Sequence, residues 1–175
     1  LKLKTIKIIN KSEYGWIEYV EHKSCNNSYE AMNYYNRIGM LLCILYAFNT
    51  TDSHYENLIA NGENPILIDL ETLFHPNESV NSFYNKKNIH QEYWHSVLRT
   101  GMLPIWEKKG TVFFDTSALG SYFFKQNVSN IKWININKNG MNIKFKITPF
   151  SDSKKNNVPL LNKRKLLPSK YIQDL

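Results

Sequence analysis

The hydrophobic positions fall into short runs near both ends of the chain and into one long run around residue 40. The runs LKLKTIKII (1–9) and YGWIEYV (14–20) are rich in β-branched and aromatic residues and are separated by the polar NKSE, which predicts two strands or a strand pair. IKWININ (131–137) and MNIKFKITPF (141–150) predict another hairpin.

A long helix is predicted over about 28–48, because Asn27 or Ser28 can cap its start and apolar residues then recur at helical spacing. From Ile38 onward the helix is apolar almost all round, which is typical of a helix buried on several sides. A second helix is predicted over about 89–99. Cys43 and several aromatic residues are expected to be core rather than ligand contacts: Tyr35, Tyr46, Trp94 and Trp106.

Two polar stretches, TDSHYEN (51–57) and IDLE (68–71), lie on either side of a predicted hairpin. Asn61-Gly62 separates the apolar runs NLIA and PILID, although a loop from 61 to 64 is longer than the tightest type. An antiparallel pair brings the residue before its first strand next to the residue after its second. We therefore expect the two polar stretches to converge.

The spacing of these polar residues fits phosphotransfer chemistry. Asp52 and Asn57 are five apart and Asp69 lies twelve beyond, as the catalytic Asp, metal-binding Asn and metal-binding Asp do in phosphotransferases of the protein-kinase fold. The chemistry needs a carboxylate that accepts the proton of the attacking hydroxyl and hard oxygen ligands for Mg²⁺. His54 stands where these kinases have a lysine, and Asp69-Leu70-Glu71 replaces Asp-Phe-Gly.

Other interpretations of the same residues stay open at this point. Asp52 to Asn57 also fits a helix C-terminal loop in which Asn57 bonds backbone, or a metal site of a hydrolase, where hard oxygen ligands favour Mg²⁺ over Zn²⁺. His54 also fits a structural histidine, and Glu56 is expected to face solvent. Arg99 fits either a structural pair or a phosphate contact. The pattern of Asp52, His54 and Asn57 also resembles small-molecule kinases of the aminoglycoside and choline type.

Composition limits the class of protein. A chain of 175 residues that is 42% hydrophobic is long enough for one domain with a core. The net charge of +7 comes from dispersed lysines and no nucleic-acid motif is present, so we predict no nucleic-acid partner. GMLLCILYAF (39–48) is about half of the roughly 20 residues that a membrane-spanning helix needs. With two cysteines and no secretion signal, we predict a cytoplasmic protein.

Four stretches together resemble the dehydratase domain of class II lanthipeptide synthetases, the LanM family: YGWIEYV, the run from Tyr34 to Pro76, SVLRTGMLPIW and DTSALG. The resemblance covers residues 14–120. It implies an α+β, protein- and lipid-kinase-like fold, mostly the C-lobe core of buried helix, catalytic loop and β-hairpin, with residues 1–13 as a remnant of an incomplete N-lobe. The basic stretch 151–175 is expected to be a flexible loop and tail.

The resemblance also implies a function in lantibiotic biosynthesis. Family members use ATP and Mg²⁺ to phosphorylate Ser or Thr of a ribosomal precursor peptide, made of leader and core, and then eliminate phosphate to give dehydroamino acids. Asp52 would be the catalytic aspartate, His54 a phosphate or substrate contact, Asn57 and Asp69 metal ligands, and Glu71 a further acidic group of the nucleotide site. Zinc belongs to a separate cyclase domain. An export transporter is a further expected partner.

Several parts of the family pattern are expected to lie outside this chain. They are the nucleotide-contacting lysine of the N-lobe, an Arg and a Thr for elimination, and the cyclase domain. We therefore expect a fragment of a longer enzyme that is inactive in isolation. The alternatives are a catalytically dead remnant or binding module of the same fold, or a small-molecule phosphotransferase.

Overall fold

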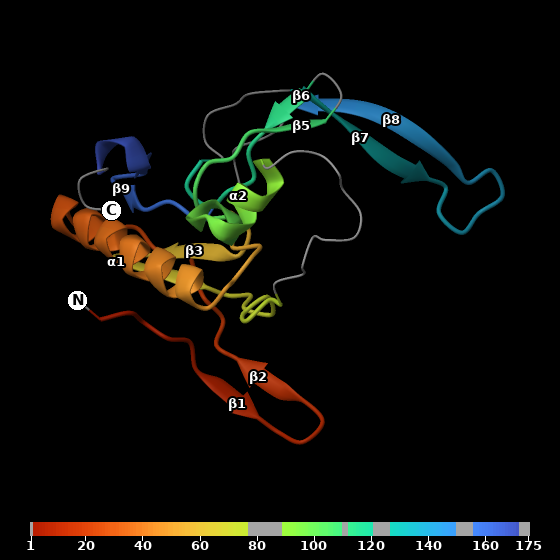
Figure 1. The fold of residues 1–175 in the computed structure, drawn as a ribbon. Coiled ribbons are helices and arrows are strands. Elements are labelled where there is room, and N and C mark those ends of the chain that lie inside the picture. The colour runs from red at the N-terminus through yellow and green to blue at the C-terminus, as the bar shows by residue number, and fades with distance from the viewer. Residues whose placement is uncertain (1, 77–88, 110–111, 121–126, 150–155, 172–175) are drawn as a thin grey trace.

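The computed structural model describes residues 2–76, 89–109, 112–120, 127–149 and 156–171 (Figure 1). The helical elements are α1 (Ser28–Ala47), α2 (Ile89–His95) and two 3-10 helices, η1 (Val97–Thr100) and η3 (Pro168–Lys170). The strands, in order from β1 to β10, are Ile8–Asn10, Gly15–Ile17, Leu58–Asn61, Asn64–Leu67, Glu107–Lys109, Val112–Phe114, Asn127–Ile134, Asn142–Pro149, Leu160–Leu161 and Arg164–Lys165. The loop predicted up to Lys87 lies outside the described residues.

The strands within these ranges pair only with their neighbours along the chain, as antiparallel hairpins. The predicted pairing of β1 with β2 and the predicted β7–β8 hairpin are both confirmed. Figure 1 shows these two hairpins reaching away from the body formed by α1, β3 and β9. The kinase-like fold as a whole stays a prediction. None of the described helices is long and apolar enough to cross a membrane.

Helix α1 begins where the sequence predicts. The side chain of Asn27 accepts a hydrogen bond from the backbone N–H of Glu30 (2.9 Å), and the Glu30 carboxylate in turn accepts from the backbone N–H of Asn26 (2.8 Å). These reciprocal bonds satisfy N–H groups that a helix start otherwise leaves unpaired.

The burial predicted for the second half of α1 is wrong. The buried residues lie mostly in its first half, whereas Cys43, Ile44 and Ala47 are exposed. Tyr35 is buried as predicted, but Tyr46, Trp94 and Trp106 are 43%, 43% and 47% exposed. Apolar composition favours burial but does not create a covering element, so these positions depend on what packs against them.

The core joins α1 to the β3–β4 hairpin and to two later segments, through Tyr34, Ile38, Leu58, Met102 and Leu119. It also includes the end of the described chain. The Tyr34 hydroxyl donates to the carbonyl of Asn157 (2.8 Å), and the Tyr35 ring stacks on Tyr171 at 4.9 Å.

The expectation of a flexible stretch over 151–175 does not hold for residues 156–171. Val158 is 1% exposed, and the fully buried Asn157 donates its side-chain amide to the carbonyl of Ala118 (2.5 Å). Buried groups with satisfied hydrogen bonds belong to the folded body. The charged residues of this segment favoured a flexible tail, but they flank a short stretch around Val158 that is buried.

An ion pair between the buried Arg37 and the half-buried Glu63 fixes the tip of the β3–β4 hairpin to α1. Arg37, 7% exposed, lies 3.0 Å from the Glu63 carboxylate and also donates to the Glu63 carbonyl (2.8 Å). Asn33 donates to the same carboxylate (2.8 Å). The hydrogen bond from Arg37, followed by that from Asn33, lowers the pKa of Glu63.

The hairpin turn is tighter than the sequence suggests. Asn61 pairs with Asn64, so the loop consists of Gly62 and Glu63 alone. Gly62 has φ 60°, and a positive φ at the first loop position is what glycine supplies in two-residue hairpins.

We predict that Glu63→Gln lowers stability at neutral pH and flattens the pH dependence of unfolding. Because the pKa of Glu63 is lower in the folded than in the unfolded chain, its ionised form stabilises the fold above about pH 4.5, and this contribution is lost as the pH falls through the folded value. Urea unfolding of both proteins at pH 7 and in the acid range measures this. The difference in free energy should shrink in acid, whereas an equal difference at every pH contradicts the assignment.

The two cysteines should differ sharply in reactivity. Cys25 is buried and Cys43 exposed. Burial, followed by the charges of Glu30 and Glu63, raises the pKa of Cys25 to about 11, and the thiolate is the reactive form. At pH 8 we expect a thiol reagent to modify Cys43 rapidly and Cys25 only after unfolding. The variant Cys43→Ser should abolish the rapid phase, and rapid labelling of Cys25 in that variant would count against its burial.

Candidate active site

The loop that leaves α1 carries the first polar stretch. Phe48 ends the helix, and Asn49 turns the chain with φ 53°. Asp52 also has a positive φ, 61°, a conformation that Asp and Asn adopt more readily than most residues. Thr50 and Ser53 are buried at 1% and 2% exposure. The backbone of the loop is thus held inside the protein.

The predicted convergence of the two polar stretches is confirmed. Leu58 pairs with Leu67, and the backbone N–H of Ile68 donates to the carbonyl of Asn57 (3.0 Å). This extension of the ladder places Asn57 beside the residue that precedes Asp69. The hydroxyl of Thr72 also donates to the carbonyl of Thr51. The residues before β3 and after β4 therefore lie side by side.

Asp52 and His54 face each other, with Asp52 Oδ1 and His54 Nε2 3.7 Å apart. His54 Nδ1 accepts a hydrogen bond from the backbone N–H of Glu56 (3.1 Å). A neutral imidazole that accepts at Nδ1 carries its proton on Nε2. His54 therefore presents a donor and Asp52 an acceptor on the same side of the loop. Both are accessible, since the side chains are 26% and 59% exposed.

Asn57 and Asp69 offer oxygen atoms at the end of the hairpin. The Asn57 amide nitrogen donates to the carbonyl of Asp52 (3.0 Å), as the backbone-bonding interpretation expects, which leaves its Oδ1 as the atom that can ligate a cation. Asp69 Oδ1 accepts from the backbone N–H of Glu71 (3.3 Å), and Asp69 itself is exposed. An amide and a carboxylate oxygen are suitable Mg²⁺ ligands.

This pair of ligands suits a weakly held hydrated ion. Within the described ranges no three or more His, Cys, Asp or Glu side chains gather into a metal cluster. Mg²⁺ is commonly bound by one or two carboxylates together with substrate phosphates and water. Amide and carboxylate oxygens are thus donor types that a magnesium–nucleotide complex uses.

The remaining acidic side chains of the loop are peripheral. Glu71 is exposed, and its backbone supports Asp69. Glu56 is exposed, as expected. It accepts a hydrogen bond from the Tyr55 hydroxyl (3.2 Å). Burial, followed by the Glu56 charge and this bond, raises the pKa of Tyr55.

Arg99 binds the end of α1. Its guanidinium donates to the carbonyls of Tyr46 (2.6 Å) and Trp94 (3.3 Å) and lies 4.6 Å from the centre of the Tyr46 ring. Cations favour helix C-termini, where carbonyls lack partners. Of the two alternatives for Arg99, the structure supports the structural pair.

Two segments that the sequence patterns did not place near the loop support it. Ser53 donates its backbone N–H to the carbonyl of Thr100 (2.8 Å), and Tyr55 donates to that of Thr116 (3.1 Å). His54 also forms an antiparallel bridge with Ser117. Both segments come from stretches for which no contact with the loop was predicted, SVLRTGMLPIW and DTSALG. No periodic pattern predicts that these segments contact the loop. Only their similarity to the family motifs marked them as relevant.

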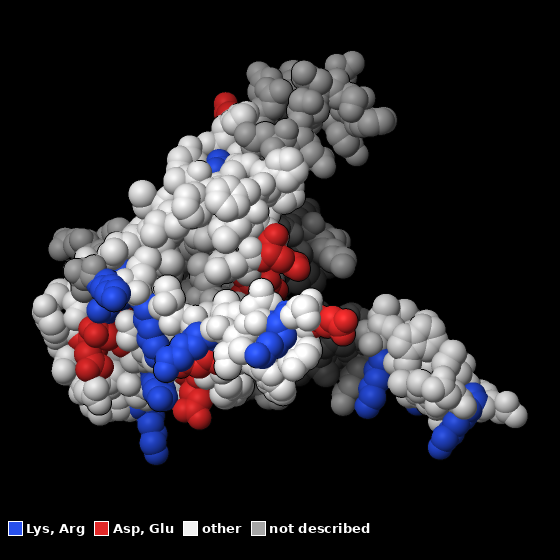
Figure 2. Space-filling model, turned by 90° about the horizontal axis from the view of Figure 1, so that it is seen from below, with Lys and Arg blue, Asp and Glu red and all other residues white. Residues whose placement is uncertain are grey.

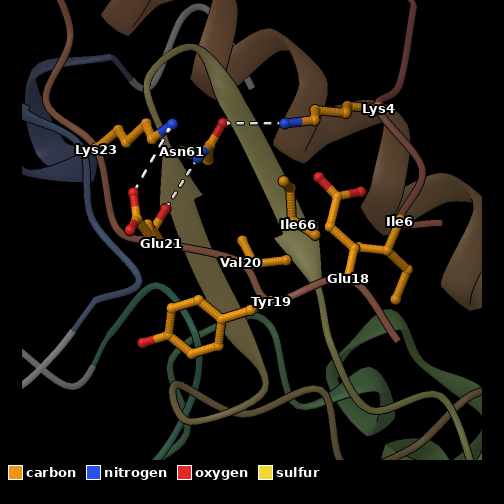
Figure 3. Close-up of a pocket in the computed structure, with 9 residues that line it drawn as sticks. All are labelled: Lys4, Ile6, Glu18, Tyr19, Val20, Glu21, Lys23, Asn61 and Ile66. Carbon is orange, nitrogen blue, oxygen red and sulfur yellow. Dashed lines mark hydrogen bonds and ion pairs between the residues drawn. The ribbon is translucent and has the colours of Figure 1, made fainter. Parts of the chain in front are cut away.

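A small pocket lies between the β3–β4 hairpin and the N-terminal segment. It has a volume of about 110 Å³ and is lined by Lys4, Ile6, residues 18–21, Lys23, Asn61 and Ile66 (Figure 3). Asn61 joins its walls by accepting from Lys4 (3.3 Å) and donating to the carbonyl of Glu21 (2.9 Å). Ligand pockets usually measure about 300–1,000 Å³, so this one is too small for a nucleotide.

Charge is dispersed on the face of the molecule that Figure 2 shows, where acidic side chains lie between basic ones. A nucleic-acid-binding face would instead gather its Lys and Arg side chains into a patch or stripe. On this face, therefore, nothing about the net charge of +7 points to nucleic acid.

Residues 1–175 match the family described as domain of unknown function DUF4135, and the chain belongs to that family. Over 81 residues it is 46% identical to the lacticin 481/lactococcin biosynthesis protein LcnDR2 of Lactococcus lactis subsp. lactis. That match covers 46% of this chain but 9% of the relative. The two findings confirm the predicted resemblance to LanM-type synthetases.

Proposed function

We propose that this chain supplies the catalytic loop and metal-binding hairpin of a lanthipeptide dehydratase, and that it phosphorylates Ser or Thr of a precursor peptide with ATP and Mg²⁺. The observation that carries the proposal is the convergence of Asp52, His54, Asn57 and Asp69 at one end of the β3–β4 hairpin. The relative named for lacticin 481 biosynthesis supports the peptide as substrate.

We assign the roles of Asp52 and His54 from the acceptor and donor atoms that their side chains present. The Asp52 carboxylate accepts the proton of the Ser or Thr hydroxyl while the hydroxyl oxygen attacks the γ-phosphorus of ATP, and ADP leaves. His54 would donate its Nε2–H, which lies beside the Asp52 carboxylate, to a phosphate or substrate oxygen. Loss of the α-proton and of phosphate from the phosphorylated residue then gives dehydroalanine or dehydrobutyrine. We assign no residue of this chain to that elimination.

Asn57 Oδ1 and the Asp69 carboxylate would hold Mg²⁺, which supplies charge neutralisation to the nucleotide phosphates when bound. Glu71 would add negative charge beside the same ion. The fit rests on the chemistry of the donor set, because both groups are oxygen donors next to the end of the hairpin. The kinase-like fold and a cytoplasmic location, where ATP is available, belong to the same proposal.

We predict that Asp52→Asn lowers the rate of peptide phosphorylation by about 10²–10⁴-fold. Asn retains the size of the side chain and tolerates the left-handed backbone at φ 61°, so the fold should be unchanged. Mass spectrometry of the precursor peptide after incubation with the full gene product and ATP measures phosphorylated and dehydrated forms. Glu56→Gln, which neutralises an exposed carboxylate of the same loop, is the matched control. Undiminished dehydration by Asp52→Asn would exclude its role as base.

We predict that Asp69→Asn raises the Mg²⁺ concentration that gives half-maximal phosphorylation. The amide keeps the oxygen that accepts from Glu71 but loses the negative charge, and loss of even an outer-shell partner typically costs roughly 10–100-fold in metal affinity. A Mg²⁺ titration at saturating ATP measures the midpoint, again with Glu56→Gln as control. Equal midpoints for Asp69→Asn and the control would remove Asp69 from the metal site.

A further inference from the structure

The buried carboxylate of Asp115 lies outside the site described above, yet it controls a segment that touches the catalytic loop. We propose that Asp115 is a positioning residue for the phosphotransfer reaction, which holds residues 116–118 against the loop and thereby sets Asp52 and His54. The inference rests on the proposed function for its chemistry, but not for its structural part.

The catalytic loop is fastened by two outside segments. Its backbone donates from Ser53 to Thr100 and from Tyr55 to Thr116, one bond on each side of His54. His54 bridges Ser117 between them. The orientation of the imidazole therefore depends on where residues 116–118 lie.

The two outside segments are also bonded to each other. Ala118 donates its backbone N–H to the carbonyl of Gly101 (3.1 Å), and Leu119 donates to that of Met102 (2.9 Å). Gly101 has φ 77°, and a Cβ there would lie 3.1 Å from the backbone nitrogen of Ser53. Loop and segments are thus packed at backbone contact, so a shift of one displaces the others.

Asp115 fixes this arrangement through a single oxygen. Its Oδ1 accepts from the backbone N–H of Ser117 (2.9 Å) and, more weakly, from that of Ile105 (3.4 Å), and the residue is 8% exposed. The Ser117 hydroxyl accepts from the backbone N–H of Gly120 (3.0 Å), where a Cβ would lie 1.8 Å from Asp115 Oδ2. Asp115, Ser117 and Gly120 of DTSALG are thus joined by direct contacts.

Asp115 could act through the hydrogen bonds of Oδ1 or through its negative charge, and the state of its second oxygen helps to distinguish the two. Oδ2 is buried and accepts no hydrogen bond from the described residues. If Asp115 acts by holding Ser117 through Oδ1, an amide oxygen can replace it. If the charge itself were required, the amide would fail. Asp115→Asn and Asp115→Ala therefore give different results under the two roles.

The experiment combines hydrogen exchange with kinetics in the full gene product. Asp115→Ala should speed amide exchange in residues 51–57 but not in β7–β8, and should lower kcat by about 10²-fold, as misplaced catalytic groups do, with little change in KM for ATP. Asp115→Asn should retain most of the protection of residues 51–57 from exchange and most of kcat. Glu92→Gln, an exposed acid on α2, is the control.

Each outcome decides one question. Unchanged exchange in residues 51–57 of Asp115→Ala, or equal loss in the Asn and Ala variants, overturns the inference. Faster exchange in a protein whose wild type transfers no phosphate overturns the proposed function and leaves the structural part standing. If Asp115→Ala does not fold, Asp115→Asn carries the test: its amide oxygen can still accept from the backbone N–H of Ser117, so exchange in residues 51–57 should match the wild type, and faster exchange there overturns the inference.

Discussion

The register of the β3–β4 hairpin is the constraint on which the rest of the site depends. A shift of one residue would exchange the faces of the hairpin and separate Asn57 from Asp69. The buried Arg37 resists such a shift because it binds Glu63 at the turn, and an unpaired buried guanidinium is costly. The ion pair at one end of the hairpin thus secures the arrangement of oxygen atoms at the other.

The loop from Asn49 to Asn57 combines buried residues with accessible polar side chains. Ser53 and Thr50 are nearly inaccessible, whereas the carboxylate of Asp52 is exposed. Loops that carry function commonly depend on rigid neighbours for their shape. Here the neighbours are the segments around Gly101 and Ser117, which lie far along the chain but meet the loop through backbone hydrogen bonds.

Much of the site was accessible to sequence reasoning because its elements are local. The capped start of α1, the hairpin and the meeting of Asn57 with the residues before Asp69 all follow from short-range patterns and strand geometry. The sequence wrongly predicted that Tyr46, Trp94 and Trp106 are buried, because exposure depends on which other elements cover a residue. The packing of residues 156–171 was missed because a charged surrounding hides Val158 and Asn157.

By itself, the sequence determined the family, the order of helix, polar loop and hairpin, and the identity of the oxygen-bearing residues. Only the tertiary structure decided that Nδ1 of His54 accepts a hydrogen bond from Glu56, that Arg99 binds a helix end, and that Thr116 and Ser117 lie against the loop. The last two of these features depend on hydrogen bonds between residues far apart along the chain. Local sequence patterns do not predict such bonds, because the pattern around each partner is the same whether or not the other partner lies near it in space.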